Sequence, residues 1–103
     1  MKSETDINDR ISHDRIIRYL RKTEIALRKV RISAPTKSFL RKVAEDFYRM
    51  AESYYKDAMY FYENGNFVNA FACVNYAHAW LDAGVRLGVF DVGEDYDLFT
   101  LYE

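Results

Sequence analysis

The chain is poor in the residues that turn or cross-link a backbone: its 103 residues include one proline, four glycines and one cysteine, and no glutamine. β-Sandwiches and barrels need turn residues at short intervals, so this composition argues against both. Cys73 has no second cysteine to pair with and lies in an apolar stretch, as expected for a thiol in a reducing cytosol. No apolar run approaches the roughly 20 residues that span a bilayer, and no segment resembles a secretory signal. These absences predict a soluble, cytoplasmic protein with no membrane partner.

Apolar and aromatic residues, by contrast, are plentiful. Half of the residues are hydrophobic and 17% are aromatic, with nine tyrosines and seven phenylalanines. A chain of this length has room for a single domain, 1–103, built on one core. The aromatic residues are enough for that core, with some left over for an interface.

Charge is divided unevenly between the two halves of the chain. Residues 1–49 hold thirteen Lys or Arg against seven Asp or Glu, a net of +6, while residues 50–103 hold two against nine, a net of −7. Such asymmetry marks either a nucleic-acid-binding surface or two halves that attract each other, within one chain or across a dimer. We favour the second interpretation, in which the two oppositely charged halves attract each other.

The stretch from Asn66 to Gly88 organises the rest of the chain. Only Asp82 and Arg86 carry full charge in it, and small residues recur between large apolar ones. A helix that is apolar nearly all round is normally buried, and small residues let neighbouring backbones approach closely. We therefore predict that this stretch is the central helix of a small bundle.

Apolar spacing predicts two further helices before the central one, separated by two breakers. Pro35 disfavours helical geometry at the residue before it, and Gly65 suits the left-handed position that ends a helix. The expected fold is all-α, a three-helix bundle without a sheet, in which the short turn at Gly65 makes the second and third helices an antiparallel hairpin. The expected bounds are 6–31, 36–64 and 66–88 for the helices and 89–103 for a short C-terminal tail.

Two apolar stripes run along the second predicted helix, one expected to face the central helix and the other the first helix. We expect a homodimer to form through surface that stays uncovered on the first two helices or on the tail. Part of the acidic, aromatic tail should also dock on the bundle or on a neighbouring chain. The stripes are Leu40, Ala44, Phe47, Ala51, Tyr54, Ala58 and Phe61, and beside them Tyr48, Tyr55, Met59 and Tyr62.

The first predicted helix is amphipathic, with Ile16, Leu20 and Leu27 in an apolar stripe that Thr23 completes. A solvated surface is the simplest interpretation of its basic face. Nucleic-acid binding is the alternative, although no recognisable binding motif is present. The basic face comprises Arg15, Arg18, Arg21, Lys22, Arg28 and Lys29.

Four polar residues of the central helix follow one another at steps of three, four and four, which places them along one helix face. Among them, His78 and Asp82 are i, i+4 neighbours and can share a hydrogen bond that orients the imidazole. The four form either a binding site or a structural stripe of satisfied polar groups, and we favour the structural interpretation. They are Asn75, His78, Asp82 and Arg86.

Sequence motifs that carry chemistry are absent. One His and one Asp on the central helix are too few for a zinc site, and there is no zinc-protease, phosphate-loop or nucleophile-elbow motif. We therefore expect no catalytic residue, no metal ligand and no cofactor.

Around the predicted hairpin the residues form a recognisable pattern. The pattern consists of Tyr54-Tyr55-Lys56-Asp57-Ala58, Gly65-Asn66-Phe67, Ala70-Phe71, Tyr76-Ala77-His78-Ala79-Trp80-Leu81-Asp82-Ala83 and Arg86-Leu87-Gly88. It resembles the archaeal family known as domain of unknown function 357, over roughly 38–90 and more loosely over the first helix. The resemblance implies a compact helical bundle in an archaeal cytosol, and it implies no activity.

Two classes of function stay open at this point. The first is a non-enzymatic interaction module that self-associates, with a further protein partner allowed for. The second is a nucleic-acid-binding protein that uses the basic face of its first helix, and an enzyme ranks third.

Overall fold

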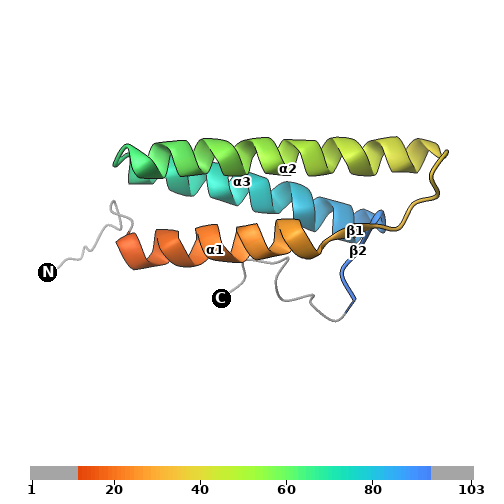
Figure 1. Ribbon diagram of the computed structural model, residues 1–103, viewed down its shortest axis with the longest axis horizontal. Coiled ribbons are helices and arrows are strands. Elements are labelled where there is room, and N and C mark those ends of the chain that lie inside the picture. The colour runs from red at the N-terminus through yellow and green to blue at the C-terminus, as the bar shows by residue number, and fades with distance from the viewer. Residues whose placement is uncertain (1–11, 94–103) are drawn as a thin grey trace, which may run out of the picture.

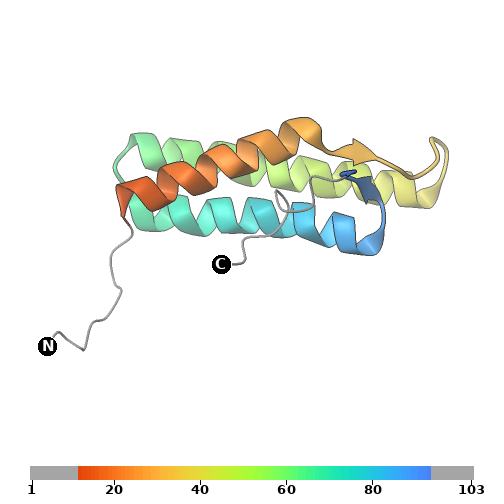
Figure 2. The same cartoon turned by 90° about the horizontal axis from the view of Figure 1, so that it is seen from below.

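The computed structural model describes residues 12–93, which form three helices and one two-stranded β pair (Figures 1 and 2). The helices are α1 (His13–Lys29), α2 (Phe39–Glu63) and α3 (Phe67–Leu87). Both views show α2 and α3 side by side along the long axis, with α1 lying along the pair. The predicted all-α bundle, with its second and third helices as an antiparallel hairpin, is confirmed.

Each helix begins where a polar side chain caps it. Ser12, Ser38 and Asn66 each accept a hydrogen bond from the backbone N–H three residues further on, at 3.1, 3.1 and 3.4 Å. Such caps satisfy a backbone donor that the first helical turn leaves unpaired. The first two helices consequently start later than predicted, at His13 and Phe39. Residues 6–11 of the predicted first helix lie outside the described range.

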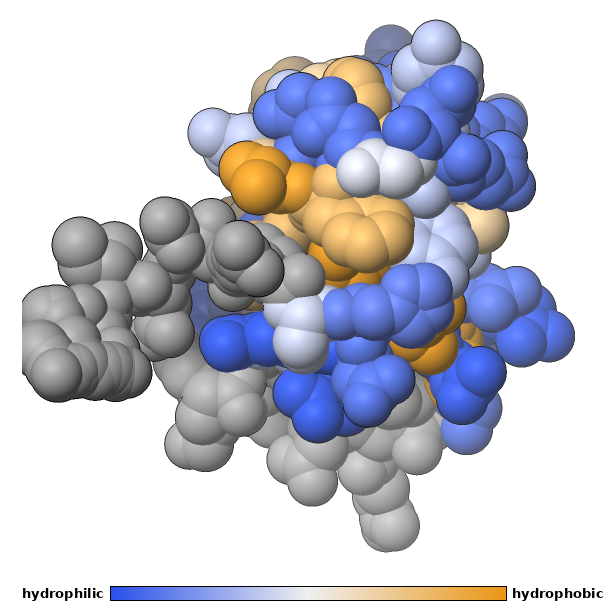
Figure 3. All heavy atoms as spheres, turned by 90° about the vertical axis from the view of Figure 1, so that its left-hand side faces the viewer, coloured by the Kyte–Doolittle hydropathy of each residue, from blue (hydrophilic) through white to orange (hydrophobic). Residues whose placement is uncertain are grey.

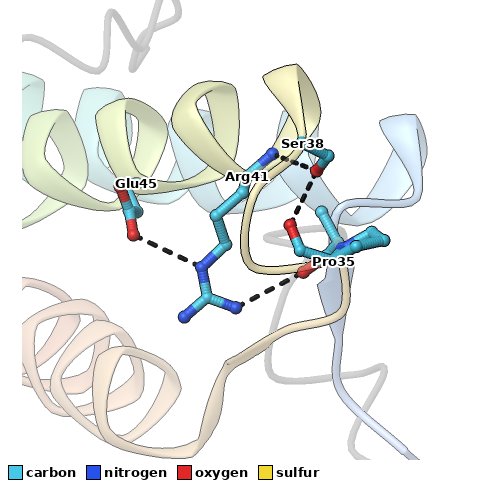
Figure 4. A network of polar contacts seen from close by, with 5 residues as sticks. Pro35, Ser38, Arg41 and Glu45 are labelled. Atoms are coloured by element: carbon cyan, nitrogen blue, oxygen red, sulfur yellow. Dashed lines mark hydrogen bonds and ion pairs between the residues drawn. The ribbon is translucent and has the colours of Figure 1, made fainter.

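The late start of α2 comes from the loop in front of it (Figure 4). The Ser38 hydroxyl donates a hydrogen bond of 2.7 Å to the Pro35 carbonyl, which closes a turn before the helix. The Arg41 guanidinium, one turn into α2, reaches back to the Ala34 carbonyl and along the helix to Glu45, both at 3.3 Å. The predicted start at residue 36 is wrong because this turn occupies the intervening residues.

The α2–α3 hairpin is built on a matched set of small residues. Gly65 turns the chain with a positive φ of 76°, which glycine adopts without steric cost. On each helix three buried small residues recur at intervals of seven residues. Each of those on α2 precedes Asn64 by the same number of residues as its counterpart on α3 follows it. The set is Ala44, Ala51 and Ala58 on α2, and Gly84, Ala77 and Ala70 opposite them on α3.

Both apolar stripes of α2 are used within the chain. Phe47 of the first stripe packs on Trp80 of α3, with ring centroids 5.0 Å apart. Tyr48 of the second stripe donates a hydrogen bond of 3.0 Å from its hydroxyl to the Leu27 carbonyl of α1. The prediction that one stripe faces the central helix and the other faces the first helix is therefore confirmed. All four residues of the second stripe are half-buried, so α1 covers this stripe in part.

A short β pair closes the end of the bundle opposite the hairpin turn. β1 (Arg31–Ile32) follows α1 and pairs antiparallel with β2 (Phe90–Asp91), which follows α3. The expectation of no sheet is wrong here, and the expected extension of the first helix to residue 31 is wrong for the same reason. The pair is held by its surroundings, since Phe90 is buried and the Ser33 backbone N–H donates to the Val89 carbonyl at 2.9 Å.

The β pair also bears on the prediction that part of the tail docks on the bundle. Val89 and Phe90, the first residues of the predicted tail, are 1% and 4% exposed, so this part docks on the bundle. Phe90 lies against Gly84 so closely that a Cβ on the glycine would overlap its ring. The remainder of the predicted tail, residues 94–103, lies outside the described range.

Candidate functional site

His78, the centre of the predicted polar stripe, lies in the core. It is 2% exposed, and Thr23 of α1 beside it is fully buried. The His78 Nδ1 and the Thr23 Oγ1 share a hydrogen bond of 3.3 Å across the α1–α3 contact. Burying two polar groups is tolerable when they satisfy each other. The pair is therefore a structural contact between α1 and α3.

The other three stripe residues have different surroundings. Asn75 is half-buried and donates from its side-chain amide to the Phe71 carbonyl one turn earlier, at 3.0 Å. Asp82 accepts a hydrogen bond of 3.0 Å from the exposed Arg86 guanidinium. The structure thus directs His78 and Asp82 to different partners, where the sequence suggested that they share a hydrogen bond.

Helix geometry explains why the stripe does not form one site. Eight residues separate His78 from Arg86, and at 3.6 residues per turn this leaves a rotation of about 80° beyond two full turns. The stripe therefore winds from the core at His78, through the half-buried Asp82, to solvent at Arg86. The four residues share a flank of α3 but do not converge on a common point.

Thr23 is the partner that the sequence reasoning missed. The signal was present, because Thr23 is the one polar residue in the apolar stripe of α1. A hydroxyl in a core stripe needs a hydrogen-bond partner. The buried His78 on the neighbouring helix supplies it.

The second histidine lies away from the first. His13 starts α1, where its Nε2 is 3.0 Å from the Tyr62 hydroxyl and its ring packs near Phe67. It lies ten residues before Thr23, or about 15 Å along the helix. The two histidines therefore do not form one site, and within residues 12–93 no three His, Cys, Asp or Glu side chains gather as metal ligands would.

Replacing His78 by alanine tests the structural role of the buried pair. We expect a loss of roughly 1–3 kcal/mol in the free energy of unfolding, because the Thr23 hydroxyl would stay buried without its partner. Asp82→Asn should cost less than about 1 kcal/mol, since Arg86, its partner, is half-exposed. Thermal melting of both variants beside the parent measures the difference.

The matched control for this prediction is the exposed histidine. His13→Ala removes the same side chain from the surface and should lower the melting temperature much less than His78→Ala. Residues kept for a ligand usually cost the fold some stability, so their removal tends to raise the melting temperature. An unchanged or raised midpoint in both His78→Ala and Asp82→Asn would show that the stripe is a binding site.

The six residues of the basic face of α1 have different surroundings. Arg15 packs over the Tyr19 and Phe71 rings, 5.6 and 5.5 Å from their centroids. Arg28 lies 4.0 Å from Glu24, an exposed pair of little energetic weight. Lys29 is exposed in the last turn of α1. The remaining three basic residues line a hollow of about 520 Å³, and they are Arg18, Arg21 and Lys22.

A second hollow, of about 430 Å³, lies beside the β pair. Arg28, Arg31 and Arg41 line it from α1, β1 and α2. Arg31 pairs with Asp91 at 3.3 Å, and the Gly93 backbone N–H together with this arginine lowers the pKa of the Asp91 carboxyl. Arg31 therefore serves the β pair and Arg41 the start of α2, while Arg28 lies beside Glu24 of its own helix.

The sole cysteine is not activated. Cys73 is half-buried on α3, and burial, with a smaller effect of the Asp57 charge, raises the pKa of its thiol. A reactive cysteine needs a lowered pKa, because the thiolate is the nucleophile. At neutral pH the Cys73 thiol is protonated.

The outer face of α3 is a row of exposed apolar residues. Its exposed apolar residues recur at steps of four, four, three, four and four, the pattern of a helix face that packs on another helix, and Asn69 and Arg86 are exposed beside them. The three largest, Val68, Tyr76 and Leu87, are 61%, 58% and 53% exposed. At the hairpin end, too, apolar side chains reach the surface between hydrophilic ones (Figure 3). We call this set the outer face: Val68, Ala72, Tyr76, Ala79, Ala83 and Leu87.

These features define a small helical-bundle protein with a buried polar contact and an apolar helix face on its surface. A family model described as "Protein of unknown function (DUF357)" matches residues 18–90. The chain belongs to this family, as its hairpin residues suggested, and the match also takes in most of α1.

The other comparisons add no relative. No curated protein and no solved structure matches the chain. Among residues 12–93, no helix combines the length and the apolar composition that crossing a membrane requires.

Proposed function

We propose that this protein is a non-catalytic interaction module that self-associates through the outer face of α3. The observation that carries the proposal is that face itself, because six apolar residues on one side of α3 stay exposed, with Asn69 and Arg86 as the exposed polar residues beside them. Contiguous exposed apolar surface is rare on monomers and commonly marks a protein-binding site.

A second copy of the chain suits this surface because the outer face is self-complementary. In a two-fold pair each surface element meets its own counterpart, so i contacts j and j contacts i. If two α3 helices cross antiparallel about the middle of the face, Val68 meets Leu87 and Tyr76 meets the small Ala79. The two remaining alanines of the face meet each other.

The area of the outer face is large enough for such a pair. Val68, Tyr76 and Leu87 each keep more than half of their surface exposed. Together with the three alanines, two copies would bury on the order of 1,000 Å², which is the lower limit of a specific interface. The expected dimer is therefore reversible.

The proposal includes no catalytic activity because of the surroundings of the two groups that could carry it, the His78 imidazole and the Cys73 thiol. His78 is buried against Thr23, and the Cys73 thiol has a raised pKa. A catalytic base or nucleophile must reach its substrate and carry a suitable pKa. The protonated Cys73 thiol suits a reducing cytoplasm. Cytoplasmic location and archaeal origin stay predictions.

Sedimentation velocity at micromolar concentration tests the self-association. The parent should sediment above its 12.2 kDa monomer mass, with a concentration dependence typical of a reversible dimer. Ala79→Arg places a charge at the centre of the outer face and should return the chain to a monomer. Ser53→Arg adds the same charge at an exposed position of α2 and should leave the dimer intact.

Two results would count against the proposal. A parent that sediments only as a 12.2 kDa monomer would contradict self-association. Duplex DNA binding at physiological salt, removed by changing Arg18, Arg21 and Lys22 to Glu, would favour the nucleic-acid alternative instead. Such affinity should fall with salt at a log–log slope of about −0.9 per phosphate contact.

A further inference from the structure

The α2–α3 hairpin has two sides, and α1 lies along one of them (Figures 1 and 2). On that side the Tyr48 hydroxyl of α2 donates to the Leu27 carbonyl, and His78 of α3 bonds to Thr23. Phe47 directly precedes Tyr48, and successive helical residues are about 100° apart, so the Phe47 ring lies on the other side of the hairpin. Among residues 12–93, α1 is the one further helix, so this second side has no helix over it.

Aromatic side chains meet across this second side. Phe47 of α2 packs edge to face on Trp80 of α3, with ring centroids 5.0 Å apart, and the Tyr54 and Tyr76 centroids are 5.3 Å apart. A surface of uncharged rings suits another apolar surface, whereas a polyanion needs cations. We call this side the open flank and define it by five half-buried residues, none of them charged: Phe47, Met50, Tyr54, Cys73 and Trp80.

We propose that a second copy of the chain covers the open flank together with the outer face of α3, so that the two hairpins pair side against side. This inference rests on the self-association proposed above and names the second half of its contact surface. Tyr76 joins the two surfaces, because it is 58% exposed on the outer face and its ring lies against Tyr54. A partner helix that contacts Tyr76 therefore lies beside α2 as well.

The area of the contact favours this larger surface. The outer face alone buries on the order of 1,000 Å² over two copies, the lower limit of a specific interface. Phe47, Met50, Tyr54 and Trp80 each keep part of their surface exposed, on the order of 50 Å² of the roughly 150–250 Å² that an aromatic side chain can bury. Covering them on both copies brings the total to about 1,400 Å², inside the standard range of roughly 1,200–2,000 Å².

The open flank also lies at the right level for a two-fold pair. The two-fold axis proposed for α3 passes midway between Tyr76 and Ala79. Met50 lies level with that point, because it precedes Asn64 by fourteen residues and position 78 follows Asn64 by fourteen. Each Met50 therefore faces its counterpart across the axis. Asp57, an exposed charge on the same side of α2, is about 10 Å further along the helix and stays at the rim.

Met50→Arg tests the open flank by placing two like charges across the axis. We expect the Kd of the dimer to rise about 30-fold or more, measured by sedimentation over a range of protein concentrations. Methionine and arginine have similar helix propensities, so α2 should persist, which circular dichroism checks. Ser53→Arg is the matched control: Ser53 is two residues past the buried Ala51, points away from α3, and should change the Kd less than about 3-fold.

The parent protein carries its own reporter of the same contact. Trp80 is the single tryptophan of the chain and belongs to the open flank. Its fluorescence maximum should move to shorter wavelength as the concentration rises through the dimer Kd, because the partner removes water from the indole. The Ala79→Arg monomer should show no such dependence on concentration. This measurement decides the question even if Met50→Arg fails to fold.

The outcomes separate this inference from the self-association on which it rests. A parent that dimerises while a folded Met50→Arg keeps the parent Kd would show that the open flank stays outside the contact. Trp80 emission that does not change as the parent dimerises would show the same. In both cases the outer face of α3 alone forms the dimer and this inference is wrong. A parent that stays monomeric would remove both proposals.

Discussion

Phe90→Ala should lower the free energy of unfolding by about 3–5 kcal/mol, the usual range when a buried phenylalanine is truncated. Phe90 is 4% exposed, packs on Gly84 and pairs through β2 with Ile32 of β1. Its ring thus joins the end of α3 to the segment that leaves α1. Chemical denaturation at a fixed protein concentration measures the loss.

Two further variants make this result specific. Phe39→Ala removes the same ring from a position that is 77% exposed, and it should cost far less. Gly84→Ala should destabilise the protein because the new Cβ overlaps the Phe90 ring, although glycine to alanine inside a helix normally stabilises by roughly 0.5–1 kcal/mol. Equal losses for Phe90→Ala and Phe39→Ala, or a more stable Gly84→Ala, would contradict the described packing.

The helices could be predicted from the sequence because each has a strong local signal. The alternating steps of α2 and the apolar composition of α3 are properties of long segments, and Gly65 supplies the turn between them. A helix end depends on a single capping side chain, which explains why α2 begins after Ser38 and not at the predicted residue 36. Periodicity identifies an element better than it locates its end.

The β pair and the buried polar contact could not be predicted in the same way. Strands of two residues are too short to show alternation, and the pairing joins Ile32 to Phe90, which lie far apart in the chain. The pairing of His78 with Thr23 likewise depends on how α1 and α3 are set against each other. Both are tertiary contacts: the local pattern marks Thr23 as a polar residue in an apolar stripe, but it does not identify the partner.

The matched small residues of the hairpin link the sequence to the fold most directly. Three alanines on α2 and, at the same distances from the Asn64–Gly65 turn, two alanines and Gly84 on α3 are all buried. Side chains this small let two helix backbones approach closely, and they leave little room for a larger group. The tight hairpin leaves the opposite side of α3 exposed, which is the outer face that we propose as the interface.

Ala51→Leu should therefore destabilise the protein strongly, at the upper end of the roughly 1–3 kcal/mol that overpacking costs. Ala51 is the middle residue of the α2 series, fully buried, and lies opposite Ala77 by its distance from the turn. Leucine is nearly as good a helix former as alanine, so helix propensity does not account for the loss. Thermal melting and chemical denaturation should both report it.

Ser53→Leu is the matched control for this last prediction. It places the same side chain two residues further along α2 at an exposed position, where no neighbouring helix has to move. We expect its free energy of unfolding to stay within about 0.5 kcal/mol of the parent value. If Ala51→Leu were equally harmless, the two helices could not be in the close contact that their small residues indicate, and the hairpin would have to pack more loosely than described.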